Sequence, residues 1–235
     1  MITEYPEFAE IFNKENLPVS AEQYECFKKY AALLVEWNQK MNLTAITDKH
    51  GITVKHFLDS VLPLNFLDIP EGASLIDVGT GAGFPGIPLK IMRPDIRLTL
   101  LDSLNKRVNF LSEVCKAIDF DTPCIHARAE ELGRDKNYRE QYDFSAARAV
   151  AAMPVLTEYC LPYVKVGGTF AALKGRNENY KECENAVKIL GGEISDVTEY
   201  ALPDGDGRTL ICIRKVKETP PKYPRNSGQI SKKAL

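Results

Sequence analysis

Apolar residues in the first third of the chain recur every three or four positions, which predicts helices. Ser20 and Gln23 form a capping box ahead of the longest run. Its apolar face consists of Tyr24, Phe27, Ala31, Leu34, Trp37 and Met41. Pro6 suits the first turn of a shorter helix that carries Phe8, Ile11 and Phe12. A third helix, which Pro63 disturbs, holds Val54, Phe57, Leu58, Val61 and Leu62. These helices are expected to cover an edge or a face of the section that follows.

Residues 73 to about 175 follow a different pattern, in which short apolar runs alternate with helical ones. This alternation is typical of βαβ units and predicts a parallel sheet. The predicted strands are Ser74–Val78, Arg97–Leu101, Thr122–Ala127, Asp143–Ala147 and Thr169–Leu173. The predicted helices are Gly86–Met92, Asn105–Ile118 and one around Met153–Tyr163. Gly167 and Gly168 are expected to turn into the fifth strand.

The last part of the pattern predicts a helix near Tyr180–Leu190, which Gly191 and Gly192 stop. Two strands follow, Glu193–Tyr200 and Arg208–Arg214, and their short connection forces them to pair antiparallel. The predicted fold is therefore α/β, with a mostly parallel seven-stranded sheet that ends in an antiparallel hairpin. It divides into an N-terminal helical extension (1–70), a Rossmann-like domain (71–217) and a tail (218–235).

Composition places the chain among soluble globular proteins, since 44% of its 235 residues are apolar and 26% are charged. No apolar run approaches the roughly 18 residues of a membrane span. The N-terminus lacks a basic region ahead of an apolar stretch, so the expected compartment is the cytoplasm. Six scattered cysteines form no CxxC motif, which indicates reduced thiols rather than a zinc site or a redox pair.

The net charge of −2 argues against a generic nucleic-acid binder, but the charge is unevenly distributed. Residues 1–25 carry six Glu and one Lys, whereas residues 214–235 carry seven Lys or Arg and one Glu. The basic tail is either solvated or a clamp for an anionic partner, and composition alone favours the solvated tail.

The chemically informative stretch is Asp77–Gly86, where the first predicted strand turns into its helix. Glycines there let the backbone turn sharply, and the helix N-terminus offers free N–H groups to an anion. One frame, Gly81, Gly83 and Gly86, spells the dinucleotide fingerprint G-x-G-x-x-G. Asp102 lies about 20 residues on, where that fingerprint has a ribose-binding acid. This frame predicts a nicotinamide-dependent oxidoreductase.

The other frame is acid-x-Gly-x-Gly-x-Gly, which begins at Asp77 and runs through Gly79, Gly81 and Gly83. A carboxylate there would repel a pyrophosphate and attract an ammonium or a sulfonium, and S-adenosylmethionine carries both. Asp102 could accept both ribose hydroxyls of an adenosine or cap the following helix.

Ala129 and Glu130 follow the third predicted strand, where a loop could meet an adenine. The spacing of Glu130 alone favours a solvent-facing helix charge.

Several motifs together resemble the RsmG family, also called glucose-inhibited division protein B. They are Trp37-Asn38, Asn42–Thr44, His56, Asp59-Ser60, Ile76–Ile91, Leu100–Leu111, Arg148–Val150, Lys174-Gly175 and Tyr223–Arg225. The resemblance covers nearly the whole chain in the expected order. It implies a class I methyltransferase that uses S-adenosylmethionine to methylate N7 of one guanosine in small-subunit ribosomal RNA. The tail departs from the family pattern, because Asn226-Ser227 stands where a basic residue is usual and the chain ends Lys-Lys-Ala-Leu.

Carried over to this chain, the resemblance implies that the motif residues hold the cofactor. Gly79, Gly81 and Gly83 would line its methionine part, with Phe84 beside it. Asp102 would hold the ribose, Ala129 and Glu130 would meet the adenine, and Arg148 would approach the methyl-transfer side.

RNA recognition relies on aromatic stacking and on Arg or Lys at phosphates. The candidate RNA-binding residues are Lys174, Arg176, Tyr223, Arg225, Lys232 and Lys233, with His56, Arg93 and Arg107 as further candidates. Lys174 ends the fifth strand on the carboxyl edge of the sheet, where ligands gather. His56 lies on an apolar helix face and is equally expected as a core histidine. Deletion of residues 222–235 is expected to weaken RNA binding and leave cofactor binding unchanged.

No catalytic base is predicted, because N7 of guanine has a free lone pair at neutral pH. The expected partner is small-subunit ribosomal RNA or the 30S particle; no metal is required, and a monomer suffices. Three alternatives stay open: a methyltransferase for a small molecule or a protein, the oxidoreductase, and a non-catalytic RNA-binding scaffold. Asp77 and the terminal hairpin argue against the oxidoreductase, and an intact glycine loop with Asp102 argues against the scaffold.

Overall fold

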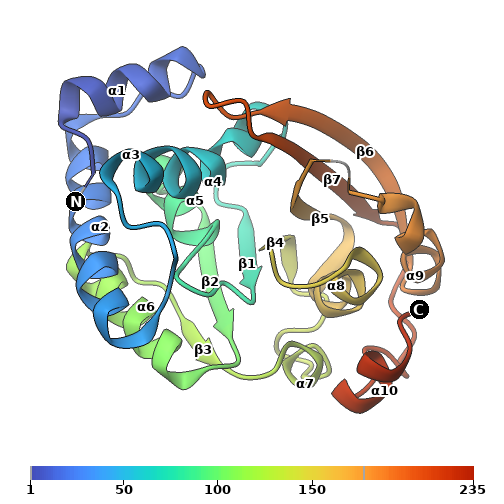
Figure 1. The fold of residues 1–235 in the computed structure, drawn as a ribbon. Coiled ribbons are helices and arrows are strands. Elements are labelled where there is room, and N and C mark those ends of the chain that lie inside the picture. Colours follow the sequence, from blue (N-terminus) through green and yellow to red (C-terminus); the bar gives the residue numbers. More distant parts are fainter. Residues whose placement is uncertain (1, 177) are drawn as a thin grey trace.

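A seven-stranded sheet forms the centre of the molecule in the computed structural model, which describes residues 2–176 and 178–235 (Figure 1). The strand order is β3-β2-β1-β4-β5-β7-β6. The strands are β1 (Ser74–Val78), β2 (Arg97–Asp102), β3 (Cys124–His126), β4 (Tyr142–Arg148), β5 (Val164–Gly175), β6 (Gly192–Ala201) and β7 (Gly207–Lys215). β1 to β5 run parallel, whereas β7 lies antiparallel between β5 and β6. The predicted α/β fold with its terminal hairpin is confirmed.

Helices cover both faces of this sheet. The N-terminal layer holds α1 (Tyr5–Lys14), α2 (Ala21–Met41), α3 (Lys49–Gly51), the π-helix η1 (Ile52–Leu58), α4 (Asp59–Val61) and η2 (Leu62–Asn65). The rest are α5 (Gly86–Met92), α6 (Asn105–Ala117), α7 (Ala129–Leu132), α8 (Met153–Cys160), η3 (Leu161–Tyr163), η4 (Tyr180–Cys183), α9 (Glu184–Ile189) and α10 (Ser227–Lys232). Figure 1 shows α2, α5 and α6 on one side of the sheet and α8 and α9 on the other.

Alternate residues of β1 supply the two apolar cores that these layers enclose. Leu75 packs into the core shared with the N-terminal helices, while Ile76 and Val78 face the core beneath α8 and α9. A strand buried on both faces is the arrangement that the continuous apolar runs of the sequence predict. The chain first adds β2 and β3 on one side of β1 and then adds β4 and β5 on the other side. At such a switch in strand order, the carboxyl ends of the two neighbouring parallel strands, here β1 and β4, border a crevice.

The N-terminal predictions hold with one change. The capping box is present, since the Ser20 hydroxyl accepts from the Gln23 amide and the Gln23 side chain accepts from the Ser20 amide. The third predicted helix is a continuous series of short pieces from α3 to η2, with a π-helical centre over Ile52–Leu58. Pro63 falls in the 3-10 segment η2, where the α-helical pattern has already ended.

Two strand predictions and two helix predictions were wrong in their bounds by more than one residue. The helix predicted around Met153–Tyr163 divides into α8 and η3. β3 is shorter than predicted, and β5 continues through Gly167 and Gly168 instead of turning there. Gly168 lies against the carbonyl of Asp143 on β4, so a glycine there permits close strand approach rather than a turn. The helix predicted near Tyr180–Leu190 splits into η4 and α9.

The basic tail folds back onto the protein, contrary to the solvated tail that composition favoured. Tyr223 and Ile230 are buried, and Arg225 forms an ion pair with the fully buried Glu158 of α8 at 2.6 Å. Arg139 donates to the carbonyls of Thr219 and Tyr223, each at 2.6 Å. The net charge of the tail could not predict this packing, because contacts of a few apolar residues and buried ion pairs hold the tail against the protein.

No helix in the described residues is long and apolar enough to cross a membrane. All six cysteines are free; Cys26 and Cys124 are half-buried and the other four are buried.

Candidate functional site

The glycine loop leaves β1 through three residues with positive φ. These are Gly79 at 69°, Gly81 at 61° and Gly83 at 100°, a region that favours glycine. The loop is packed from below, because the Tyr30 hydroxyl donates to the Ala82 carbonyl. The sequence pattern therefore marks a real sharp turn at the carboxyl edge of β1.

Asp77 lies beneath this loop and fastens it. Its Oδ2 accepts from the Thr80 hydroxyl at 2.6 Å and from the Gly86 amide at 2.8 Å. Its Oδ1 is buried and makes no hydrogen bond within the described residues. Burial raises the pKa of this carboxyl from 3.8 to about 6. Asp77, which the sequence analysis assigned to a cationic ligand, therefore also stabilises the glycine loop through hydrogen bonds. One of its two oxygens has no hydrogen-bond partner within the described residues.

Replacement of Asp77 by asparagine is expected to remove a pH dependence of stability. The folded protein holds this proton more tightly than the unfolded chain, so stability is lost as pH rises through about 6. Between pH 4.5 and 7.5 the wild-type free energy of unfolding should fall by about 2 kcal/mol relative to Asp77→Asn. Urea unfolding of both proteins across this range measures the difference. Parallel pH profiles would contradict the assignment.

Asp102 ends β2 and connects the glycine loop to the next helix. Its Oδ2 accepts from the Gly81 amide and its Oδ1 from the Leu104 amide, both at 2.9 Å. Leu104 is the N-cap residue of α6, so Asp102 is not that helix's cap. A side chain only 2% exposed at a pocket wall is placed to meet a ligand rather than solvent.

A pocket of about 120 Å³, here called the glycine-loop pocket, brings several predicted cofactor residues together. Its walls include Gly79, Asp102, Ala129, Glu130, Val150 and Tyr159. Glu130 is 4% exposed and accepts from Arg128 Nε at 2.7 Å, so the solvent-facing interpretation of its spacing was wrong. Ala129 is fixed from behind, because the Tyr163 hydroxyl donates to its carbonyl at 2.7 Å.

The donor and acceptor groups of this pocket suit an adenosine. Three such groups border the pocket. They are the backbone of the glycine loop at Gly79, the carboxylate of Asp102 at the end of β2, and the carboxylate of Glu130 on α7. A ribose diol needs acceptors, and an adenine amino group needs one as well, which both carboxylates supply. The residues present therefore fit the nucleoside part of S-adenosylmethionine.

Phe84 and Arg148 lie on the other side of the loop. The His56 ring stacks on Phe84 with centroids 4.6 Å apart, and the Arg148 guanidinium lies 4.8 Å from the Phe84 centroid. Burial and the Arg148 charge lower the pKa of His56 to about 4, so its imidazole is neutral at pH 7. Its Nε2 is 2.7 Å from the Thr44 hydroxyl. His56 is therefore a satisfied, largely buried histidine beside the site.

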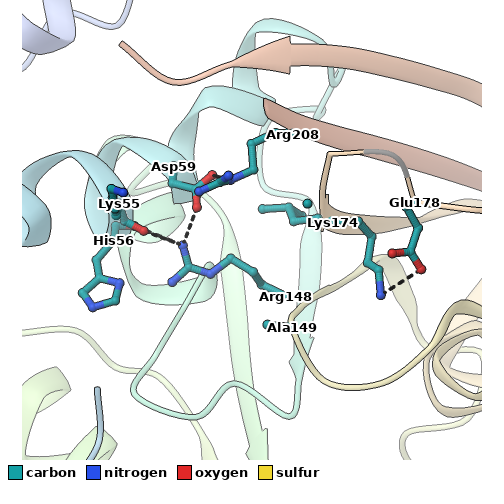
Figure 2. A pocket seen from close by; sticks show the side chains of 10 residues that line it. Lys55, His56, Asp59, Arg148, Ala149, Lys174, Glu178 and Arg208 are labelled. Atoms are coloured by element: carbon teal, nitrogen blue, oxygen red, sulfur yellow. Dashed lines mark hydrogen bonds and ion pairs between the residues drawn. The ribbon is translucent and has the colours of Figure 1, made fainter. Parts of the chain in front are cut away.

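A second hollow of about 410 Å³, here called the arginine pocket, opens next to Arg148 (Figure 2). Its walls include Lys55, Asp59, Arg148, Lys174, Glu178 and Arg208. They come from the N-terminal helices, the ends of β4 and β5, the segment that follows β5, and the start of β7. Four cations and two carboxylates line the pocket, and Lys55 also pairs with Asp204 and Asp206 just outside it. The pocket therefore offers charged groups of both signs to an occupant.

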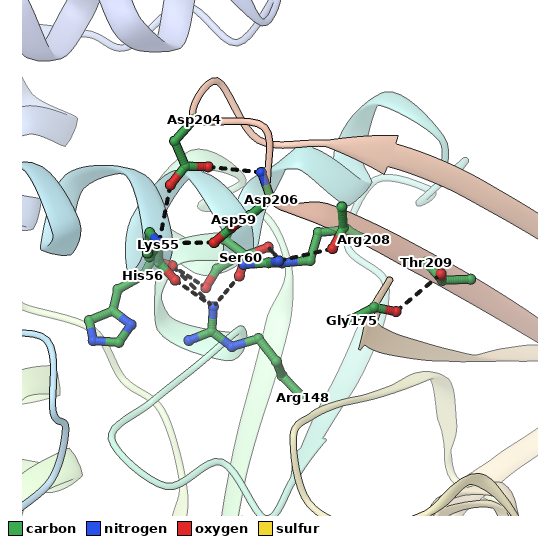
Figure 3. Close-up of polar contacts among 11 residues, drawn as sticks. Lys55, His56, Asp59, Ser60, Arg148, Gly175, Asp204, Asp206, Arg208 and Thr209 are labelled. Carbon is green, nitrogen blue, oxygen red and sulfur yellow. Dashed lines mark hydrogen bonds and ion pairs between the residues drawn. The ribbon is translucent and has the colours of Figure 1, made fainter. Parts of the chain in front are cut away.

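Asp59 joins the two arginines of this pocket. Its Oδ1 is 2.8 Å from Arg208 Nε and its Oδ2 is 3.3 Å from Arg148 Nη1 (Figure 3). Sequence reasoning missed Arg208 and gave no role to Asp59. The only available signal was the position of Arg208 at the start of the last strand, which did not reveal that β7 lies beside β5.

The segment Arg148–Val150 divides the two pockets. Ala149 lines the arginine pocket in the left-handed region at φ 55°, and Val150 lines the glycine-loop pocket. A Cβ at Gly79 would lie 2.9 Å from Val150 Cγ2, so this glycine allows the segment to approach the loop. Both pockets therefore meet at the carboxyl ends of β1 and β4.

Comparison with known proteins decides between the two frames of the glycine loop. A family model for rRNA small subunit methyltransferase G matches residues 23–204. This chain belongs to that family. A curated relative of that name from Acetivibrio thermocellus is 54% identical over 217 residues, covering 91% of this chain and 89% of its own. Another from Streptococcus pneumoniae is 48% identical over 232 residues, covering 97% and 98%. Membership of a methyltransferase family favours the acid-x-Gly-x-Gly-x-Gly frame and is incompatible with the oxidoreductase alternative.

Solved structures support the class I methyltransferase fold. A putative methyltransferase in complex with the Haloferax volcanii activator Trm112 has a TM-score of 0.59 at 16% identity, covering 78% of this chain and 98% of its own. Geranyl diphosphate C-methyltransferase from Streptomyces coelicolor, solved with S-adenosyl-L-homocysteine, has a TM-score of 0.54 at 12% identity, covering 68% and 79%. These two likenesses show the fold, which is the one that the sequence predicted.

Four of the predicted RNA-binding residues of this family member fall into two groups. Lys174 lines the arginine pocket, and the exposed Arg176 lies against Gly207 in a shallow groove that shares Arg208 with it. Tyr223 and Arg225 instead make contacts inside the protein, as described above.

The remaining candidates lie apart from the arginine pocket. Lys232 and Lys233 are exposed at the end of α10. Arg93 pairs with Asp95 at 2.8 Å, and Arg107 lies 3.5 Å from Asp102.

Proposed function

We propose that this chain transfers the methyl group of S-adenosylmethionine to N7 of a guanosine in small-subunit ribosomal RNA. One observation carries the proposal beyond family membership. A pocket lined by two carboxylates adjoins a larger pocket lined by four cations at one sheet edge, and the Arg148–Val150 segment contributes to the walls of both. Such an arrangement suits a small donor on one side and a large anionic acceptor on the other.

S-adenosylmethionine, when bound, supplies an electrophilic methyl group on a sulfonium. The protein's contribution is alignment and exclusion of water, which raise the rate without acid–base chemistry. Asp102 and Glu130 would hold the nucleoside, and the glycine loop would leave room for the methionine part. Arg148, fixed by Asp59 and stacked near Phe84, would define the boundary between donor and acceptor.

No residue of the arginine pocket needs to act as a base. Guanine N7 carries a free lone pair, and His56 is neutral and already bonded to Thr44. After transfer the guanine carries a positive charge, which the carboxylate of Glu178 can offset. The pocket thus accommodates both the electron-rich acceptor and its cationic product.

A cellular test of the proposed function uses a bacterial strain that lacks the endogenous family enzyme. Expression of this chain is expected to restore 7-methylguanosine in digested small-subunit rRNA, measured by mass spectrometry. The Gly81→Ala variant at equal abundance serves as the control and is expected to restore little. Absence of the nucleoside, together with measurable cofactor binding, would favour a small-molecule or protein acceptor instead.

A further inference from the structure

One ion pair in the arginine pocket has no role in the predicted cofactor site or in the packing of the apolar cores. Lys174, at the end of β5, has a side chain that is 10% exposed, and its Nζ is 3.1 Å from Glu178 Oε1. The same Nζ donates to the Ala151 carbonyl at 2.9 Å. Figure 2 shows this pair facing Arg148 across the pocket. The pair thus connects the acceptor side to the segment that divides the two pockets.

The two carboxylates of the arginine pocket differ in how many of their oxygens already have a partner within the protein. Both oxygens of Asp59 are taken by Arg148 and Arg208. Glu178 uses only Oε1, for Lys174, and among the described residues its Oε2 makes no hydrogen bond. Its side chain is 26% exposed and lines the pocket. Glu178 is therefore the open acceptor of the arginine pocket, with an ammonium directly beside it.

An adjacent carboxylate and ammonium match one edge of guanine. Guanine presents N1–H and the N2 amino group as donors and O6 as an acceptor on its Watson–Crick edge. Adenine presents an acceptor at N1 and a donor at N6, which is the reverse order. Recognition of an unpaired RNA base through this edge leaves N7 free, because N7 lies on the other side of the ring.

We propose that the arginine pocket holds the acceptor guanine and that Glu178 and Lys174 read its Watson–Crick edge. Glu178 accepts from N1–H and the N2 amino group, and a third hydrogen of Lys174 Nζ is donated to O6. This inference rests on the proposed function, and it goes further by naming the groups that select guanine. The free N7 edge is then available to the methyl donor at the Arg148–Val150 boundary.

The test compares guanosine with inosine, which lacks only the N2 amino group. The methylated position is first mapped, and small-subunit rRNA carrying guanosine or inosine there is prepared and reconstituted as the wild-type enzyme requires. Wild-type kcat/KM is expected to be about 10- to 100-fold lower for inosine, because one hydrogen bond to a charged acceptor is lost. Glu178→Ala removes the acceptor for both N1–H and the N2 amino group, so its guanosine value is expected to fall to or below the wild-type inosine value, and its guanosine-to-inosine ratio is expected to approach one.

Matched variants separate recognition from folding. Glu184→Ala removes an exposed glutamate of the neighbouring α9 and is expected to keep the wild-type ratio. Glu178→Gln keeps one acceptor oxygen and is expected to give an intermediate ratio. All three variants are expected to bind S-adenosylmethionine with wild-type affinity, measured by calorimetry, since Glu178 lies outside the glycine-loop pocket.

A wild-type guanosine-to-inosine ratio in Glu178→Ala would overturn the inference while leaving the proposed function intact. Loss of cofactor affinity with that ratio unchanged would also overturn it, by assigning the pocket to the methionine end of the cofactor. A wild-type protein that binds S-adenosylmethionine and does not methylate guanosine would contradict the proposed function and this inference together.

Discussion

Replacement of Arg225 by alanine is expected to destabilise the protein by about 3–5 kcal/mol, because it leaves the fully buried Glu158 carboxylate without a charged partner. Arg225 bonds this carboxylate through its amide at 2.7 Å and its guanidinium at 2.6 Å. Denaturant unfolding measures the loss. A change below about 1 kcal/mol, the range of an exposed ion pair, would contradict the structural role of the tail.

A paired variant distinguishes the buried charge from lost packing. Arg225→Met combined with Glu158→Gln removes both charges and keeps similar volumes, so it should recover much of the stability lost in Arg225→Ala. If the pair is no more stable than the single variant, the uncompensated Glu158 charge is not the cause.

The tail also supports the cofactor side of the site. Pro224 lies against Gly133, its carbonyl accepts from Arg134 Nε at 2.7 Å, and Tyr159 of the glycine-loop pocket directly follows Glu158 on α8. Deletion of residues 222–235 is therefore expected to weaken S-adenosylmethionine binding. This reverses the expectation from sequence, which had the tail touching RNA alone.

Gly81→Ala is expected to lower S-adenosylmethionine affinity by about 10- to 100-fold, with a loss of stability limited to the backbone strain at this position. At φ 61° an alanine costs about 1–2 kcal/mol, and its Cβ meets no atom closer than 4.0 Å. The added methyl group therefore projects into the space above the loop that the ligand would occupy. Calorimetric titration and denaturant unfolding measure the two quantities on one preparation.

Gly83→Ala is the matched contrast within the same loop. Its Cβ would lie 2.6 Å from the Tyr30 hydroxyl and from Ile87 Cδ1, at φ 100°. Strain and overpacking together should cost about 2–5 kcal/mol of stability. Equal effects of the two substitutions on stability and affinity would contradict separate roles for the open and packed sides of the loop.

The sequence predicts those parts of this protein that depend on local patterns. Alternating apolar runs located the strands, and a glycine pattern between a strand and a helix located the loop with Asp77 and Asp102. These signals work because the backbone geometry they require is set by neighbouring residues. The spacing of Glu130 predicted a solvent-facing side chain, but its position after the third predicted strand still made it a candidate contact for the adenine.

The arginine pocket could not be predicted in the same way. Asp59, Arg148 and Arg208 meet only because η1 and α4 pack beside the end of β4 and the start of β7. The count of charges along the tail also could not predict that Arg225 pairs with Glu158, because the two residues are 67 positions apart in the chain. Long-range ion pairs leave no periodicity in a single sequence, so they appear only in the fold.

The most direct measurement supplies purified protein with methyl-labelled S-adenosylmethionine and small ribosomal subunits from a strain lacking the modification. The rRNA is then digested to nucleosides and separated. We expect the label in 7-methylguanosine with the wild-type protein, and at least about 10-fold less with Gly81→Ala at the same subsaturating cofactor concentration. Label in another nucleoside, or none in RNA while the cofactor binds, would contradict guanine N7 methylation as the function of this site.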